Sequence, residues 1–214
     1  MFNGVVSRSR EGANARDRRD LRGELVAAAV EMLAQPQPVA VPSLRSIARA
    51  CQVAPSAVYW HFPSEADLRS AVLDAEYTSL ICTVEAALDS APDDTDRLVV
   101  AGDAYITWAL EHPGAYQLLF ESDDELPATR AEHGPRLQQR IVELARRVDP
   151  QAPFTAALLL WSAWHGVVSL RLHKTEWDWG MTPQEANERL VAALTTRRSS
   201  QESSAENGSQ HHDP

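Results

Sequence analysis

The sequence predicts an all-α protein, with an N-terminal three-helix unit of helix-turn-helix type followed by a larger helical domain. Apolar residues recur every three or four positions along most of the 214 residues, which is the period of an amphipathic helix. Capping residues and prolines separate these segments, as they do at helix ends. No alternation of apolar and polar residues continues far enough to predict a β-strand.

The first predicted helix begins at Leu21. Four apolar residues follow at helical offsets and share one face: Leu25, Ala29, Met32 and Leu33. The helix must end before the proline-rich stretch 36–38, because an interior proline removes a backbone hydrogen bond and clashes with the preceding turn. This helix completes a three-helix unit with the two short helices that follow.

The second predicted helix follows Ser43, which is a good N-cap residue. Leu44, Ile47 and Ala48 share one face of this helix, and Arg45 lies on the other. The helix is therefore half apolar and half basic.

The third predicted helix begins after the helical period breaks at 52–54. Pro55 suits its first turn, because the N–H that proline lacks has no helical partner there. Val58 and Phe62 can pack inward. Five residues of this short helix are left to face outward: Ser56, Ala57, Tyr59, Trp60 and His61.

Two short helices joined by a tight turn are typical of a DNA reader, whose second helix enters the major groove. We expect Tyr59 and His61 to contact phosphate, although both could instead pack against the neighbouring helix. The predicted DNA-binding residues are Ser43, Leu44, Arg45, Ser56, Ala57, Tyr59, Trp60 and His61. Ser56, Ala57 and Trp60 should lie nearest the bases.

The segment resembles the DNA-binding domain of the TetR family of bacterial one-component repressors, with its pattern T-x-R-x-I-A-x-x-A-G-V-S-x-x-x-[VL]-Y-x-H-F. Nine residues fit the pattern in order and spacing: Ser43, Arg45, Ile47, Ala48, Val53, Val58, Tyr59, His61 and Phe62. The resemblance implies a homodimer that binds a double-stranded DNA operator.

Three positions depart from the family pattern. Gln52 replaces the turn glycine, so it must adopt a left-handed conformation or use a different turn. Ala54 replaces the Ser or Thr that caps the recognition helix, which removes about 1 kcal/mol of helix stability. Glu65 stands where many members have a lysine close to the DNA backbone. The departures leave a second hypothesis, a helical ligand-binding or interaction protein that has lost DNA binding.

The net charge of −10 is unevenly distributed. Residues 1–70 hold nine arginines against seven acidic residues, whereas residues 71–214 hold eleven basic against twenty-three acidic residues. Six of the arginines lie within residues 1–22. This N-terminal arm either enters a minor groove or remains solvated.

Further helices are predicted downstream. Ser64 and Asp67 form a capping box at the start of a long helix that ends near Leu88. The next helix starts at Asp94 or Thr95 and is broken by Pro113. The other helical segments are expected at 116–120, 137–148, 154–172 and from Thr182 onward, with an acidic loop at 121–127.

The segment WSAWHGVVSLRLH, with Tyr105–Phe120, is similar to the TetR C-terminal class named for a Trp-His-Gly motif. The similarity implies dimerisation through Phe154–Leu172 and Pro183–Thr196 and a central pocket for a small apolar effector. We expect this pocket to be lined by Tyr105, Trp108, Tyr116, Phe120, Trp161, Trp164 and His165. For any single residue of this set, ordinary core packing is the alternative.

The sequence predicts neither a metal site nor a cofactor, because its internal histidines lack metal-ligand spacing. A helical enzyme is a third hypothesis, but no Ser, His and acidic residues have a spacing that forces a shared site. The chain has no run of about 18 apolar residues and no apolar signal region, so we expect a cytoplasmic protein without a membrane partner. Cys51 and Cys82 are expected to be buried thiols.

The sequence thus predicts a ligand-responsive transcriptional regulator of repressor type, released from a pseudo-palindromic operator by a small apolar effector. Its expected parts are a basic arm at 1–17, a helix-turn-helix domain at 18–66, an effector-binding and dimerisation domain at 67–198 and a disordered tail at 199–214.

Overall fold

The computed structural model describes residues 21–33, 42–91, 94–121 and 128–194. All regular elements in these ranges are helices, so the predicted all-α class is confirmed. The predicted basic arm and the predicted C-terminal tail lie outside the described residues.

The chain forms two compact units. The first comprises Met1–Glu76 with His112–Pro127, and the second comprises Tyr77–Glu111 with Ala128–Pro214. Helix α4 (Glu65–Ser90) passes without interruption from the first unit into the second.

The first unit contains a helix at residues 21–32, α2 (Leu44–Ala50), α3 (Pro55–His61), the start of α4 and α6 (Pro113–Phe120). Apolar side chains from the first four of these helices are fully buried: Leu25, Ile47, Val58, Phe62 and Leu68. The guanidinium of Arg22 lies over the Phe62 ring, 4.9 Å from its centroid. Met32, which the periodicity placed on the buried face, is instead exposed.

The predicted caps fix where α2 and α4 begin. The Ser43 hydroxyl accepts the backbone N–H of Ser46 at 3.2 Å. At α4, Ser64 accepts the backbone N–H of Asp67 at 3.2 Å, and the Asp67 carboxylate accepts that of Ser64 at 3.0 Å. This reciprocal pair is a complete capping box, which satisfies two helix-end donors.

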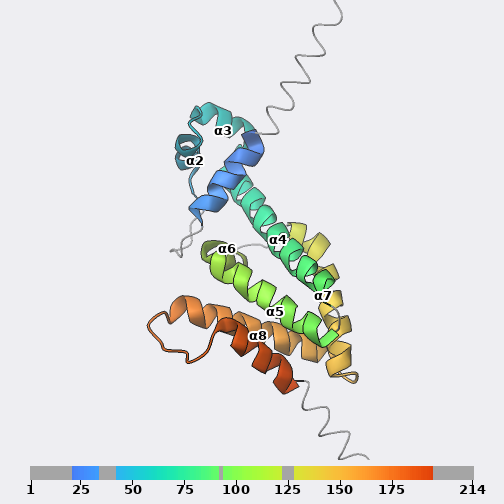
Figure 1. Cartoon of the computed structure of the whole chain (residues 1–214). Helices are drawn as coiled ribbons and strands as arrows, with labels where there is room; N and C mark the ends of the chain where they lie inside the picture. The colour runs from blue at the N-terminus through green and yellow to red at the C-terminus, as the bar shows by residue number, and fades with distance from the viewer. Residues whose placement is uncertain (1–20, 34–41, 92–93, 122–127, 195–214) are drawn as a thin grey trace, which may run out of the picture. The chain divides into compact units, whose positions relative to one another are not determined.

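The second unit is a bundle of longer helices (Figure 1). It contains the rest of α4, α5 (Asp94–Glu111), α7 (Ala128–Val148), α8 (Pro153–His173) and a helix at 183–194. Helix α8 packs against both α5 and α7. By length and composition alone α8 could cross a membrane, a test that core helices also pass.

A buried amide fastens the last described helix to this bundle. Asn187 accepts the indole N–H of Trp164 at 2.7 Å and donates to the Val99 carbonyl at 2.7 Å and to Asp103 at 2.9 Å. A Cβ on Gly102 would lie 2.3 Å from the Asn187 amide oxygen. Only glycine therefore lets α5 approach the amide closely enough for these bonds.

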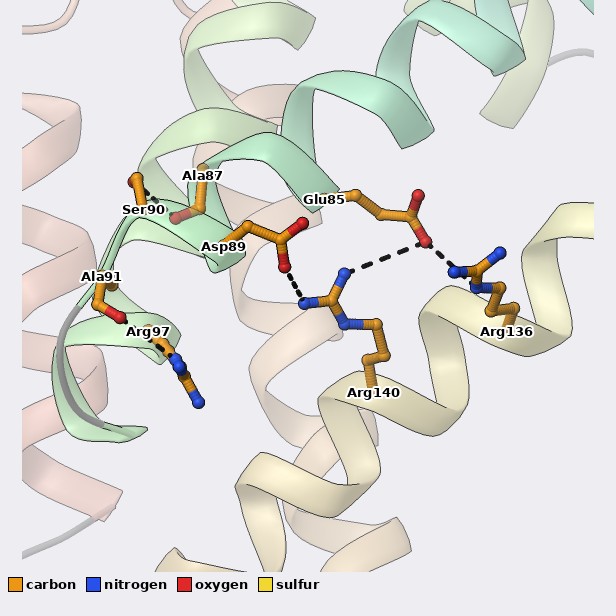
Figure 2. Close-up of polar contacts among 8 residues, drawn as sticks. All are labelled: Glu85, Ala87, Asp89, Ser90, Ala91, Arg97, Arg136 and Arg140. Carbon is orange, nitrogen blue, oxygen red and sulfur yellow. Dashed lines mark hydrogen bonds and ion pairs between the residues drawn. The ribbon is translucent and has the colours of Figure 1, made fainter.

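Helices α4 and α7 are joined by an ion-pair cluster at their surface (Figure 2). Arg140 of α7 bonds Asp89 at 2.5 Å and lies 4.0 Å from Glu85, both on α4. Arg136 lies 3.6 Å from the same Glu85 oxygen. Two cations on consecutive turns of α7 thus meet two anions on consecutive turns of α4.

Candidate DNA-binding and effector sites

The turn between α2 and α3 has the left-handed geometry that the sequence left open for Gln52. Its φ is 55°, the one positive φ among described residues other than glycine. A glutamine in this region costs roughly 1–2 kcal/mol, because its Cβ approaches the following carbonyl oxygen. The usual turn is therefore kept despite the missing glycine.

Helix α3 presents its side chains as the sequence predicts. Val58 and Phe62 are buried, while Trp60 is 64% exposed, Tyr59 is 47% exposed and Ser56 is exposed. Ala57 and His61 are half-buried. Two large aromatic side chains exposed next to each other on one short helix make this surface a candidate for contacting another molecule.

The N-terminus of α3 lacks a side-chain cap. Ala54 occupies the N-cap position with extended backbone, and Pro55 follows it at the start of the helix. The Ala54 carbonyl accepts the backbone N–H of Ala57 at 2.9 Å, but the Ala54 side chain has no group that could accept a second one. The first turn of α3 is therefore closed by the backbone alone, without the side-chain cap that the family pattern supplies.

The three residues proposed for α2 have different exposures. Ser43 and Arg45 are exposed. Leu44 is only 2% exposed and belongs to the core, so the expectation that its side chain contacts DNA is wrong. The apolar face of α2 needs this leucine for packing, and only its backbone could approach a phosphate.

Glu65, where the family pattern has lysine, has a structural role. It is exposed in the first turn of α4, beside Asp67. A carboxylate in this position is stabilised by the positive end of the helix dipole. The same position that would repel phosphate thus favours the start of α4.

In the second unit, four of the predicted effector residues form one aromatic group. The Tyr105 hydroxyl and His165 Nδ1 share a hydrogen bond. Their ring centroids are 5.3 Å apart, Trp161 lies 5.0 Å from His165, and Trp164 lies 6.3 Å from Tyr105. The group combines apolar surface with one titratable imidazole.

The other three predicted effector residues lie elsewhere. Trp108 is buried on α5 and donates its indole N–H to Ser79 of α4 at 3.1 Å. Tyr116 and Phe120 belong to the first unit, where their ring centroids are 5.4 Å apart on α6. The structure therefore gathers four of the seven residues into one group.

The first unit also buries an acidic residue that the sequence analysis did not single out. Glu76 on α4 is 2% exposed, and neither carboxylate oxygen makes a hydrogen bond. His112 Nδ1 lies 3.4 Å from Oε2, close enough for an ion pair when the imidazole is protonated. Burial raises the pKa of Glu76, and His112 opposes that shift.

The sequence analysis also did not single out Asn187. In the sequence it is one polar residue in a polar amphipathic helix, and only the fold turns it inward. Burial raises the pKa of its partner Asp103, whereas the hydrogen bond from Asn187 lowers it.

The cysteine prediction was half wrong, because Cys51 is partly buried but Cys82 is exposed.

Comparisons with known proteins agree with this arrangement. Residues 25–72 match the family described as bacterial regulatory proteins of the tetR family, and residues 98–194 match the tetracyclin repressor-like C-terminal domain. The chain belongs to the TetR family. As a TetR-family protein it is a transcriptional regulator with a helix-turn-helix, in a family of regulators rather than enzymes.

Several relatives share this organisation. The transcriptional activator FasR of Mycolicibacterium smegmatis is 30% identical over 116 residues, a stretch covering 52% of each chain. The alignment thus spans about half the length of that relative. A TetR-family regulator from Streptomyces coelicolor has 17% identity and a TM-score of 0.62, over 84% of this chain and 79% of that one.

A structure of unknown function from Rhodococcus sp. RHA1 has 21% identity and a TM-score of 0.70, with 82% of this chain and 94% of that chain covered. At these identities the two structures establish the shared TetR fold alone.

Proposed function

We propose that this TetR-family regulator is a cytoplasmic, ligand-responsive repressor that binds a pseudo-palindromic operator as a homodimer. The observation that carries the proposal is α3, which presents Tyr59 and Trp60 to solvent from a helix anchored by Val58 and Phe62. Two such helices should enter successive major grooves, with half-site centres about 34–36 Å apart.

On the DNA side, phosphate contacts would set the position of α3 and base contacts its sequence preference. Tyr59 and His61 are the proposed phosphate contacts, and Ser56, Ala57 and Trp60 the residues nearest the bases. Arg45 and Ser43, exposed on α2, would contact the backbone beside them.

The aromatic group of Tyr105, Trp161, Trp164 and His165 supports a site for a small apolar effector. Apolar rings would hold the body of the effector, and the imidazole would orient one polar atom. An effector releases the operator only if it binds the DNA-free geometry more tightly, since its differential affinity sets the shift.

The outer face of α8 supports homodimerisation. Phe154, Leu158 and Leu170 are exposed on it at intervals of four residues or multiples of four, with Ser162 and Gly166 in the same row. A Cβ on Gly166 would meet nothing within 4 Å, so the protomer itself does not require glycine there. Close approach of a second α8 at Gly166 accounts for it.

The proposal is tested by selecting bound DNA from a random pool and measuring gel shifts with the selected site. Wild type should bind in two half-sites, and Tyr59→Ala with His61→Ala should weaken binding while helix content and dimer are kept. Unchanged binding by the double variant would refute the assigned contacts.

A second candidate is a ligand-binding or interaction protein that has lost DNA binding, which the uncapped α3, strained Gln52 and acidic Glu65 favour. It predicts no selected sequence and no gel shift. The sign of regulation is read from transcription of the gene beside the selected site, because the relative FasR is an activator. Loss of transcription when the protein is added supports repression.

A further inference from the structure

The loop at 174–182, between α8 and the last described helix, carries an exposed apolar surface that the proposed functions above do not use. Trp177 on this loop is 60% exposed, and Met181 is 37% exposed. In the described part of the second unit, every exposed large apolar side chain lies on α8 or on this loop. The loop follows α8 directly after His173, and Arg171 of α8 contacts Trp179 and Met181 of the loop.

The loop is held in a defined shape by its own contacts. The Arg171 guanidinium lies 5.2 Å from the centroid of the Trp179 ring and donates to the Met181 carbonyl at 2.6 Å. Asp178 accepts the backbone N–H of Gly180 at 3.0 Å, and Gly180 has the positive φ of 62° that a tight turn requires.

The two indoles of the loop also contact one another. The centroid of the Trp177 ring lies 5.4 Å from that of Trp179. A side chain presented in a fixed position loses little conformational entropy on binding, so such a loop is suited to a protein interface.

We propose that Trp177 packs against the second copy of the chain, as the outer part of the dimer interface. This inference rests on the proposed homodimer. A stable interface buries about 800 Å² on each partner, and in homodimers about 65% of that area, roughly 520 Å², is apolar. The exposed apolar side chains of α8 supply roughly 400 Å² at about 200 Å² per fully exposed large side chain, and Trp177 with Met181 adds about 200 Å².

The last described helix cannot supply the missing apolar area. Its exposed residues are polar or small: Gln184, Glu185, Glu188, Arg189, Ala192 and Ala193. The loop is also flanked by exposed Glu176 and Asp178, which repel DNA phosphate and leave a protein surface as the occupant. In a twofold interface each copy presents its loop to the other, so the area gained counts on both sides.

The test is the dimer dissociation constant of the full chain, measured by sedimentation. Trp177→Ala should weaken the dimer by at least about tenfold, because the loss of a large indole removes buried apolar area from both copies. Trp60→Ala is the matched control, because it removes an indole of similar exposure from α3. Equal dissociation constants for the two variants would overturn the inference, provided that far-ultraviolet circular dichroism shows both are folded.

If the dimer is too tight for this measurement, acrylamide quenching decides. The contribution of Trp177 is the difference in fluorescence between wild type and Trp177→Phe. In the dimer we expect this contribution to be blue-shifted and protected from acrylamide. A Trp177 contribution that acrylamide quenches freely would contradict the proposal. A wild type that sediments as a monomer at every concentration refutes the homodimer itself. A dimer unaffected by Trp177→Ala refutes only the role of the loop.

Discussion

Gly102 and Asn187 show how much of the second unit depends on single atoms. The Asn187 amide uses its oxygen and its nitrogen in three hydrogen bonds to α5 and α8. Such a buried network stabilises the fold only while every member is satisfied. The contact with Gly102 leaves no room for a methyl group.

Gly102→Ala should therefore destabilise the protein by about 1–3 kcal/mol, because the new methyl group displaces Asn187 or Trp164. The measurement is urea unfolding followed by circular dichroism. Gly23→Ala is the control, since a Cβ there meets nothing and the helix at 21–32 should gain up to about 1 kcal/mol. Similar gains in both variants would contradict the close approach.

Glu76 makes stability depend on pH. Burial raises its pKa in the folded state, so the folded protein holds this proton more tightly than the unfolded chain. The stabilising contribution is full below the ordinary glutamate pKa and is lost as pH rises through the raised value. Glu76→Gln removes that loss, because a neutral side chain has no charge to desolvate.

Glu76→Gln should thus be more stable than wild type at neutral pH, and the difference should disappear in acid. Thermal unfolding across this pH range measures it. Glu65→Gln, at an exposed position of the same helix, is the control and should show no comparable gain. If Glu76→Gln is instead less stable than wild type at neutral pH, the attraction of His112, and not desolvation, dominates the effect of Glu76 on stability.

Among the elements, α3 differs from α2 and α4 in lacking a side-chain cap at its start. Its neighbours begin with side-chain caps from Ser43 and Ser64, whereas Ala54 provides none. A single hydroxyl group at position 54 would provide the missing side-chain cap of α3.

Ala54→Ser should stabilise the protein by about 1 kcal/mol, because serine accepts an N–H of the first turn. Hydrogen exchange of the α3 amides should slow with it. Ala50→Ser, at the exposed end of α2, adds the same hydroxyl without a free helix start and should not stabilise. Equal effects of the two substitutions would show that capping is not the cause.

Helix boundaries could be predicted from the sequence because local groups set them. Thr182 and Glu185 form the expected capping box. Hydrogen bonds from the backbone and then the side chain of Thr182 lower the pKa of Glu185. The burial of single side chains was harder to predict, because more than one face of a helix can have a similar apolar pattern. Met32 is exposed because Ala29 and Leu33 already fill the core side of its helix.

The aromatic group could be predicted only in part. Tyr105 and His165 are 60 residues apart, and periodicity gives each helix a face without saying which faces meet. Tyr116 and Phe120 are aromatic residues at helical spacing, as expected for the lining of an effector pocket, yet they belong to the first unit. Buried polar residues such as Asn187 and Glu76 carry no local signal at all.

At the scale of the whole molecule, charge differs between the two parts of the chain. The first 70 residues have an excess of arginine and the remainder an excess of acid. Since α3 itself holds no arginine or lysine, operator affinity should depend on cations outside it.

Deleting residues 1–17 should lower operator affinity and flatten its dependence on salt, because fewer phosphate counterions are released. Fluorescence anisotropy over a salt series gives both quantities. Replacing the arginines of this arm by glutamine in the full-length chain separates charge from length. A salt slope that is unchanged after truncation would exclude the arm from the DNA contact.

The length of helix α4 allows a small rotation at one end to become a large displacement at the other. It is a single helix of 26 residues, and its second half is fastened to α7 by Arg136 and Arg140. At 1.5 Å per residue it is a rod of about 39 Å. If the helix pivots at Glu85, its first residue lies about 30 Å away, so a rotation of about 6.5° moves that residue by about 3.4 Å, which is the spacing of one base pair along DNA. A displacement too small to disturb packing near the pivot could thus put a reader one step out of register.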